Sequence, residues 1–249
     1  MLTQERYQSI LSIINERNAV TVAELSQMLD TSESTIRRDL NALNELGKIN
    51  KVFGGATAVA QAEGMIEDTV ITREKLMSEE KTEIARYCAT LINNTDFVYI
   101  DAGTTTSRLI DFIENDKATY VTNGIVHARK LIQKGLNAYM VGGKVKPVTE
   151  AVVGAEGINN LKNLNFSKAF MGTNGIDLQL GYTTPDIEEA MIKEMAINQS
   201  YMAFIIADHT KFRRVFPVTF SPLTKCCIIT DALPDTKYAK ETIIKEVKK

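Results

Sequence analysis

Cysteine is scarce in this sequence, and its scarcity excludes a disulfide framework and a cysteine-rich metal site. The 249 residues include only Cys88, Cys226 and Cys227, and their spacing fits no metal-binding motif. Cys226 and Cys227 are adjacent inside an apolar run, so we expect their side chains to point to opposite faces of a strand. We expect no metal site and no cofactor.

Long hydrophobic runs are missing as well. No stretch approaches the roughly 20 apolar residues that a membrane-spanning helix needs. The first residues, 1–5, lack the basic and apolar regions of a secretory signal. The sequence therefore predicts a protein of the reducing cytoplasm that has no membrane partner.

Neither an excess of positive charge nor a supply of stacking aromatics is present. The formal net charge is -2, and aromatic residues make up 7% of the chain. The charge argues against a general polyanion binder, so any contact with nucleic acid must come from a local patch and from geometry. The few aromatics disfavour an RNA-binding or single-strand-binding module, because such modules stack bases on aromatic rings.

The first 60 residues show the pattern of three short helices and a hairpin. Apolar residues at helical spacing from Tyr7 predict the first helix. Thr21 and Glu24 fit a capping box at the start of the second, and Ser32 is a suitable N-cap for the third. Residues 48–59 have the composition of a small glycine-containing hairpin.

The third predicted helix has a polar face opposite its apolar stripe of Ile36, Leu40 and Leu43. Such a face suits a DNA major groove, where Arg and Asn read base edges or phosphates. The candidate DNA contacts on this helix and the following hairpin are Ser34, Thr35, Arg37, Arg38, Asn41, Lys48 and Lys51. A polar face alone is commonly just a solvated face, but three helices and a basic hairpin within 60 residues favour a winged helix-turn-helix.

After residue 78 the pattern alternates between strands and helices. Buried strands are predicted at 97–100, 119–122, 138–141, 168–171, 201–207 and 225–230. This alternation indicates an α/β domain with a mostly parallel sheet covered on both faces. We therefore divide the chain into a DNA-binding domain at 1–59, a linker at 60–77 and a larger domain at 78–249.

Glycine-rich or polar segments follow five of the predicted strands, and ligands of parallel sheets bind at those strand ends. The candidate ligand residues are Asp101, Gly103, Thr104, Thr105, Thr106, Asn123, Gly124, Gly142, Gly143, Lys144, Gly172, Asn174, Gly175, Asp208 and Lys211. Gly103 and three threonines at a helix start suit a phosphate. Taken alone, the segment 101–106 is equally a capped turn, and Asp208 with Lys211 a turn pair.

Four further polar residues leave alternatives open. On the predicted helix at 187–198, Lys193 is either a ligand contact or a solvated lysine, and Glu189 is more simply a surface acid. His127 and His209 have no acid and nucleophile at recognisable spacing. We therefore expect no catalytic residues.

Both halves of the chain resemble the DeoR family of bacterial transcriptional regulators. The segments that carry the resemblance are 22–25, 32–40, 52–56, 101–106, 121–124, 172–175 and 181–186. The family usually has Arg and His in the hairpin where this chain has Lys51 and Phe53, and commonly Gly where this chain has Arg213. A contact to a DNA phosphate survives the change to Lys51, whereas a contact made by a histidine does not.

The resemblance implies a winged helix-turn-helix joined to a sensor domain related in fold to ribose-5-phosphate isomerase. Within the family the chain is most similar to fructose-operon repressors. This implies a repressor of a sugar-utilisation operon, with double-stranded operator DNA and a phosphorylated sugar as partners and fructose 1-phosphate as the leading effector. It also adds Thr184 and Glu189 to the effector-binding candidates.

Two expectations concern assembly and the enzyme alternative. A protein that reads repeated or palindromic half-sites is expected to be a homo-oligomer, a dimer or higher. The alternative function is a sugar-phosphate isomerase. It is disfavoured because the segments 172–176 and 181–185 mostly lack the acid and base that proton transfer between adjacent carbons requires.

Overall fold

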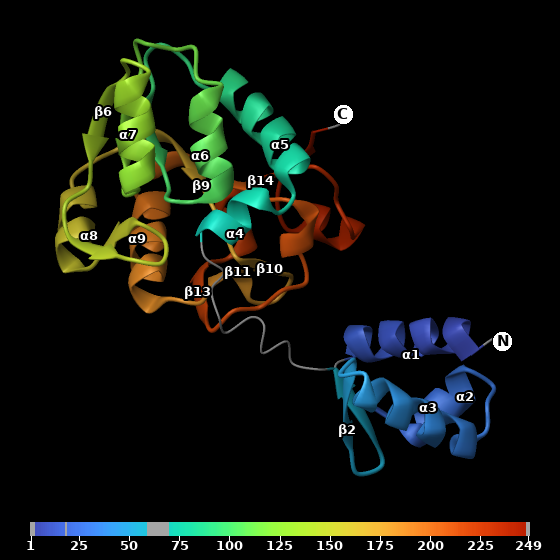
Figure 1. Ribbon diagram of the computed structural model, residues 1–249. Coiled ribbons are helices and arrows are strands. Elements are labelled where there is room, and N and C mark those ends of the chain that lie inside the picture. Colours follow the sequence, from blue (N-terminus) through green and yellow to red (C-terminus); the bar gives the residue numbers. More distant parts are fainter. Residues whose placement is uncertain (1–2, 18, 59–69, 248–249) are drawn as a thin grey trace. The chain divides into compact units, whose positions relative to one another are not determined.

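The computed structural model describes residues 3–17, 19–58 and 70–247 (Figure 1). The chain divides into two compact units, Met1–Glu63 and Gly64–Lys249. The first unit has one hydrophobic core cluster and the second has two.

The first unit is a winged helix-turn-helix. Its elements are α1 (Thr3–Arg17), β1 (Ala19–Thr21), α2 (Val22–Met28), α3 (Glu33–Glu45), β2 (Ile49–Val52) and β3 (Gly55–Ala58). The three strands form an antiparallel sheet in the order β1-β3-β2. The predicted capping box is confirmed, because Thr21 Oγ1 accepts from the Glu24 amide at 3.2 Å while Glu24 accepts from the Thr21 amide at 2.8 Å.

Side chains from all three helices fill the small core of this unit. The buried residues include Ile10, Ile14, Leu25, Ile36, Leu40, Leu43 and Ile49. Arg6 of α1 donates two hydrogen bonds, at 2.5 and 3.1 Å, to the buried carboxylate of Asp39 on α3. This ion pair fixes α1 against the helix that carries the candidate DNA contacts.

The turn of the hairpin depends on two adjacent glycines. Gly54 has φ +81°, a left-handed conformation that side chains disfavour. A Cβ on Gly55 would lie 2.3 Å from the Val20 carbonyl oxygen, because β3 crosses close to β1 there. The hairpin therefore keeps its shape only with glycine at position 55.

A seven-stranded parallel sheet forms the centre of the second unit. Its order is β15-β14-β12-β9-β4-β5-β6. The strands are β4 (Phe97–Ile100), β5 (Thr119–Thr122), β6 (Asn137–Met140), β9 (Phe166–Met171), β12 (Ser200–Ile206), β14 (Cys227–Thr230) and β15 (Ile244–Glu246). The predicted mostly parallel α/β architecture is confirmed.

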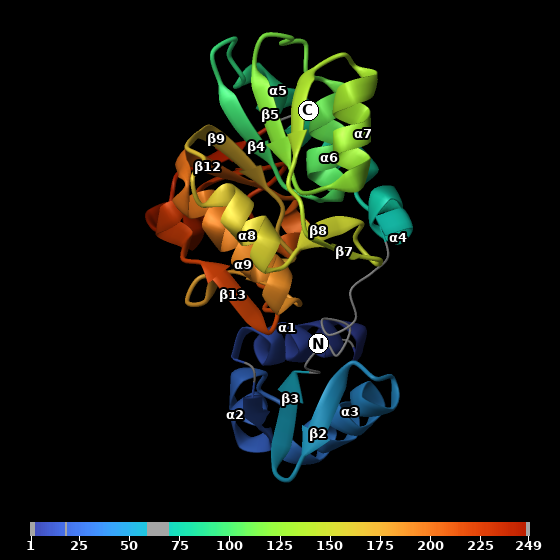
Figure 2. The same cartoon turned by 90° about the vertical axis from the view of Figure 1, so that its left-hand side faces the viewer.

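Helices cover both faces of this sheet (Figures 1 and 2). One face carries α5 (Ser78–Thr90), α6 (Thr104–Asp111) and α7 (Ile125–Gln133), and the other carries α8 (Ala155–Leu161) and α9 (Ile187–Asn198). Cys226 lies in the core on the α9 side and Cys227 packs against the other core, as expected. All three cysteines are free thiols.

Smaller elements surround the end of the sheet that carries the candidate ligand residues. They are β7 (Lys144–Lys146), β8 (Ala151–Val153), β10 (Gly175–Asp177), β11 (Gly181–Thr184), β13 (Val218–Ser221) and the 3₁₀ turns η2 (His209–Lys211), η3 (Leu223–Lys225) and η4 (Thr236–Lys240). The strands β7 and β8 form a hairpin, and β10, β11 and β13 form an antiparallel sheet. None of these strands was predicted.

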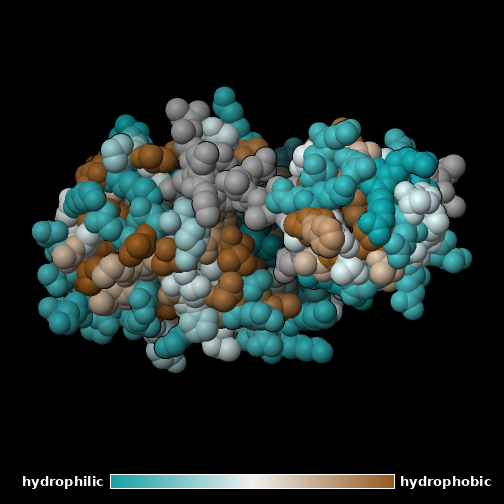
Figure 3. Space-filling view, turned by 90° about the horizontal axis from the view of Figure 1, so that it is seen from below, coloured by the Kyte–Doolittle hydropathy of each residue, from teal (hydrophilic) through white to brown (hydrophobic). Residues whose placement is uncertain are grey.

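The stretch that we expected to be a linker, 60–77, contains a helix. Residues 59–69 lie outside the described part of the chain, but α4 (Val70–Lys75) is helical and contacts α6. Within the described residues, no helix is long and apolar enough to cross a membrane. Hydrophobic side chains interrupt the hydrophilic surface at several places (Figure 3), as is usual for folded proteins.

Candidate functional site

The outer face of α3 carries the predicted DNA contacts. Ser34, Arg37, Arg38 and Asn41 are exposed, and Thr35 at the flank is half-buried. The apolar stripe of α3 is buried in the core, so the predicted division of this helix into two faces agrees with its exposure. An exposed row of hydroxyl, guanidinium and amide groups can donate to phosphates and to base edges.

The hairpin β2–β3 is connected to this face through a lysine. Lys51 Nζ donates to Asn41 Oδ1 at 2.6 Å, and the Lys51 amide donates to Asn44 Oδ1 at 2.9 Å. Lys48 is exposed at the start of the hairpin. Arg37 pairs with Glu33 one turn earlier, at 2.8 Å, on the exposed surface. The sequence pattern gave no sign of the contact between Lys51 and Asn41, which joins two elements.

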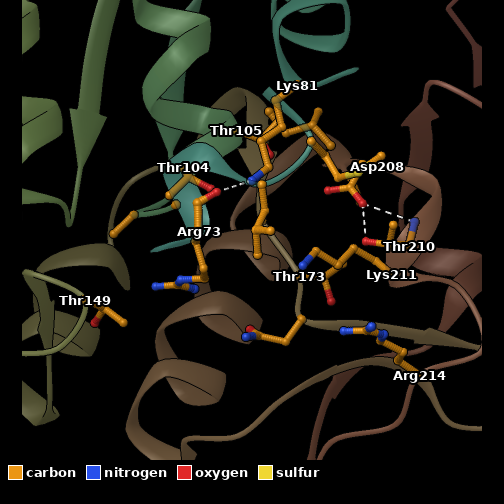
Figure 4. Close-up of a pocket in the computed structure, with 18 of the residues that line it drawn as sticks. Arg73, Lys81, Thr104, Thr105, Thr149, Thr173, Asp208, Thr210, Lys211 and Arg214 are labelled. Carbon is orange, nitrogen blue, oxygen red and sulfur yellow. Dashed lines mark hydrogen bonds between the residues drawn. The ribbon is translucent and has the colours of Figure 1, made fainter. Parts of the chain in front are cut away.

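A cavity of about 220 Å³ opens in the second unit at the carboxyl ends of β4, β9 and β12. Its lining residues are Arg73, Leu76, Met77, Lys81, Ala102, Gly103, Thr104, Thr105, Thr149, Gly172, Thr173, Asn174, Glu189, Lys193, Ile206, Ala207, Asp208, Thr210, Lys211 and Arg214. Figure 4 shows Arg73, Thr104 and Thr149 on one side of it and Asp208, Thr210, Lys211 and Arg214 on the other.

Nine of the predicted effector residues line this cavity, and nine do not. Those in the lining are Gly103, Thr104, Thr105, Gly172, Asn174, Glu189, Lys193, Asp208 and Lys211. Those outside it are Asp101, Thr106, Asn123, Gly124, Gly142, Gly143, Lys144, Gly175 and Thr184. The strand exits of β4, β9 and β12 therefore meet at one cavity, while the exits of β5 and β6 lie beside it.

Asp101 does not line the cavity, but it is bonded to Lys193, which does. The buried carboxylate of Asp101 accepts from Lys193 Nζ and, at 3.0 Å, from the Gly172 amide. Lys193 also donates to the Gly172 carbonyl at 3.1 Å. Lys193 is only 5% exposed, so the solvated alternative for it is wrong. Asp101 holds two strand exits together and positions Lys193.

A buried network shapes the start of α6. Asn123 Oδ1 accepts from the Ala102 amide at 2.9 Å, while its Nδ2 donates to the Val152 carbonyl at 3.2 Å. The Thr106 hydroxyl donates to the Asp101 carbonyl at 2.6 Å. Burial lowers the pKa of His127, whose ring lies against Gly103, to about 4, so this ring is neutral at physiological pH. These side chains fix the turn at 101–106, and both amide atoms of the buried Asn123 are bonded within the fold.

Four further residues outside the cavity have roles in the fold. Lys144 forms a surface ion pair with Glu188 at 2.7 Å, and a Cβ on Gly143 would lie 2.8 Å from the Val153 carbonyl. A Cβ on Gly175 would lie 2.4 Å from the Arg214 carbonyl oxygen. Thr184 donates to Asn174 Oδ1 at 3.2 Å and so orients a residue that does line the cavity.

Positive charge predominates in the lining. The cationic side chains are Arg73, Lys81, Lys193, Lys211 and Arg214, and the acidic ones are Glu189 and Asp208. Burial lowers the pKa of Lys81 to about 8, although the neighbouring Asp208 acts in the opposite direction. Glu189 is buried rather than on the surface, and it accepts from Thr149 at 2.8 Å and from Lys146 at 3.1 Å. The surface alternative for Glu189 is therefore wrong.

The start of α6 adds backbone donors to these charges. Gly103 is the N-cap, and within the described residues no side chain caps this helix. The first amides of a helix have no acceptor inside it, and they favour an anion. Thr104 and Thr105, the first two residues of α6, both line the cavity. The cavity is therefore suited to a small anion that carries further polar groups.

Sequence reasoning missed six polar residues of the lining. They are Arg73, Lys81, Thr149, Thr173, Thr210 and Arg214. Thr173 and Thr210 lie inside two of the glycine-rich or polar strand exits, so the sequence of these segments already indicated them. Arg73 and Lys81 belong to helices on which a cation at one position is indistinguishable from a solvated one.

Comparisons with known proteins give the family. Residues 6–62 match the DeoR-like helix-turn-helix domain, and residues 76–232 match the DeoR C terminal sensor domain. The chain is 37% identical, over 100% of both chains, to the uncharacterized HTH-type transcriptional regulator FruR of Bacillus subtilis. It is 32% identical to the lactose phosphotransferase system repressor of Staphylococcus epidermidis, over 83% of each chain.

One solved structure similar to this chain is ribose 5-phosphate isomerase from Plasmodium falciparum. The identity is 16%, the TM-score is 0.41, and the match covers 55% of this chain and 53% of the isomerase. That similarity is too weak to bear on function. The family matches cover both units, and they agree with the winged helix-turn-helix and the parallel-sheet domain described above. The chain therefore belongs to the DeoR family, and it is a DNA-binding transcriptional regulator rather than an enzyme.

Proposed function

We propose that this regulator represses a sugar-utilisation operon and that a phosphorylated sugar in the cavity controls its affinity for the operator. The observation that carries this proposal is the cavity itself, where the start of α6 meets the cations Lys81, Lys193 and Lys211. A phosphate monoester carries about two negative charges at pH 7 and three acceptor oxygens, and these match the donors present. A relative named lactose phosphotransferase system repressor supports a role as a repressor in sugar utilisation.

The proposed position of the phosphate is at Gly103, Thr104 and Thr105, with Lys81 and Lys211 as its charge partners. Thr105 is 8% exposed and lines the cavity, whereas Thr106 is fully buried and its hydroxyl is bonded within the turn. Asn174, Glu189 and Asp208 lie in the remaining lining and offer the polar groups that sugar hydroxyls need. Fructose 1-phosphate is the first candidate, because segments 172–175 and 181–186 are similar to those of fructose-operon repressors.

At the operator, α3 is proposed to enter the major groove with Ser34, Arg37, Arg38 and Asn41 facing the bases. Thr35, Lys48 and Lys51 contact the flanking phosphates. The exposure of these side chains supports this arrangement, since base edges are reached only by side chains that leave the protein surface.

The test measures binding of fructose 1-phosphate and of operator DNA by variants at two lysines. Lys211 lines the cavity, whereas Lys144, at another predicted strand exit, does not. Lys211→Ala should weaken binding of fructose 1-phosphate at least tenfold, because a charge-assisted hydrogen bond is worth about 1.5–3 kcal/mol. Lys144→Ala is the matched control and should bind as the wild type does.

Calorimetry and a mobility-shift assay on the promoter of the chain's own gene give the two readouts. Fructose 1-phosphate should release the wild-type protein from this DNA, and neither substitution should change DNA affinity in its absence. Pentose and other hexose phosphates are compared in parallel. The proposal is wrong if no phosphorylated sugar binds the wild-type protein or changes its affinity for DNA.

A further inference from the structure

Helix α4 contributes directly to the wall of the cavity. Arg73 of α4 lines it, together with Leu76 and Met77, which immediately follow the helix. Figure 4 shows the Arg73 side chain between Thr104 of α6 and Thr149 of the β7–β8 hairpin. Arg73 therefore lies beside the α6 amides at which the phosphate is proposed to bind.

The same helix is bonded to the elements that form the cavity. Lys81 Nζ of α5 donates to the Arg73 carbonyl oxygen, and Lys81 itself lines the cavity. Arg108 of α6 donates to the Glu74 carbonyl at 3.2 Å and to Ser78 Oγ at 2.8 Å. Lys81 thus lines the cavity and contacts the backbone of α4, and Arg108 connects the end of α4 to α6.

Helix α4 lies close in sequence to the DNA-binding unit. It is the first helix of the second unit, and only residues 59–69 separate it from β3 of the DNA-binding unit. A conformational change in the second unit that reaches the DNA-binding unit along the covalent chain must therefore pass through α4. Among the described elements that line the cavity, α4 is therefore the one nearest in sequence to the DNA-binding unit.

We propose that Arg73 binds the anionic group of the effector and that this contact fixes α4, so that α4 transmits effector binding to the DNA-binding unit. The inference rests on the proposed function and adds the route of regulation to it. An anion held by the α6 amides, Lys81 and Arg73 bridges α4 to α6. A ligand shifts an equilibrium between two arrangements only by its difference in affinity for them, and in this proposal the contact between Arg73 and the anion supplies that difference.

Two arginines of the same cavity make a matched pair for the test. Arg73 lies on α4, and Arg214 lies on the opposite side, between η2 and β13. Arg73→Ala and Arg214→Ala should each weaken binding of fructose 1-phosphate about tenfold, which calorimetry measures. The affinity for operator DNA is then compared without the sugar phosphate and at a concentration that saturates each variant.

The ratio of these two DNA affinities is the coupling, which is typically 5–150-fold in allosteric proteins. Arg214→Ala should keep the wild-type ratio once it is saturated, whereas Arg73→Ala should reduce the ratio toward one. Arg73→Lys keeps the charge and should retain part of the coupling. An independent readout on the wild-type protein is amide hydrogen exchange in residues 70–77, which fructose 1-phosphate should slow.

The outcomes separate this inference from the proposed function. If no sugar phosphate binds the wild-type protein, the proposed function fails and the inference fails with it. If the wild type responds and saturated Arg73→Ala responds equally, the role of α4 is wrong while the proposed function stands. Unchanged hydrogen exchange in residues 70–77 on binding leads to the same conclusion, even where Arg73→Ala does not fold.

Discussion

Lys81 is a buried cationic residue that lies where the phosphate of the effector is proposed to bind. Lys81 is 3% exposed, and several other cationic side chains line the same cavity. Removal from water disfavours the charged ammonium, and this is the main reason why the pKa of Lys81 falls to about 8. A phosphate beside it has the opposite effect, because a negative charge within a few ångströms favours the ammonium.

This arrangement predicts proton uptake when the effector binds. Near pH 8 about half of the Lys81 side chains are neutral in the free protein, and a bound phosphate dianion raises their pKa, so binding should take up close to half a proton. The phosphate itself is already dianionic at this pH, since its second pKa is about 6. Affinity for fructose 1-phosphate should therefore fall as the pH rises above 8.

Calorimetry at pH 8 in two buffers of different ionisation enthalpy measures this uptake. The observed heat should differ between the buffers for the wild type, and the difference should shrink at pH 7, where Lys81 is mostly charged before binding. Lys81→Met should bind more weakly and take up no proton. Equal heats in both buffers for the wild type at pH 8 would show that Lys81 does not face the phosphate.

At this scale the sequence predicted some residues of the site and not others. Glycine and threonine directly after a strand indicate ligand contacts, because the carboxyl ends of parallel strands lie at the edge of the sheet where ligands bind. Asn123 was chosen for the same reason, yet its amide is bonded to Ala102 and Val152 within the fold. Arg73 and Lys81 were missed, because their place in the cavity depends on how α4 and α5 pack, which no local pattern contains.

At the scale of elements, the hairpin β2–β3 and the helix α3 act as one surface. The bond from Lys51 to Asn41 joins them at 2.6 Å, so the orientation of a proposed base-reading amide depends on a residue of the hairpin. Lys48 is exposed in the same hairpin and serves as the matched control. The two lysines should therefore affect DNA binding differently.

Lys51→Ala and Lys48→Ala should each lower affinity for the operator and reduce the slope of log affinity against log salt by about one, because each proposed phosphate contact releases one counterion. Lys51→Ala should also relax the preference at the base that Asn41 reads, whereas Lys48→Ala should leave sequence preference unchanged. Binding to single-base operator variants over a range of salt concentrations checks both. An unchanged slope for Lys51→Ala would remove it from the DNA interface.

Helices with a clear period and six of the seven strands of the central sheet were predictable, because burial of one face or of both faces leaves a regular apolar pattern; the edge strand β15 was not predicted. The strands β7, β8, β10, β11 and β13 were not. They are three or four residues long, too short for a period to be visible, and they lie outside the alternation of strands and helices that marks the central sheet. Helix α4 was taken for part of a linker because its six residues carry charges and no clean apolar stripe.

At the scale of the whole molecule, the two proposed functions reside in separate compact units. All candidate DNA contacts lie between Ser34 and Lys51, and all residues that line the cavity lie between Arg73 and Arg214. The family matches divide in the same way, at residues 6–62 and 76–232. Regulation then requires that binding in one unit alter the state of the other, since neither unit contains both sites.

This separation predicts the behaviour of the two halves when they are produced alone. A fragment of residues 64–249 contains the whole cavity and should bind fructose 1-phosphate with the affinity of the full chain. A fragment of residues 1–63 has a small core and should be only marginally stable. It should bind the operator more weakly than the full chain, because it lacks any contact that the larger unit makes between copies, and fructose 1-phosphate should have no effect on it. Calorimetry on the first fragment and mobility shift on the second measure these outcomes. If a folded 64–249 fragment fails to bind the sugar phosphate that the full chain binds, the effector site extends beyond the cavity, and the separation of the two functions is wrong.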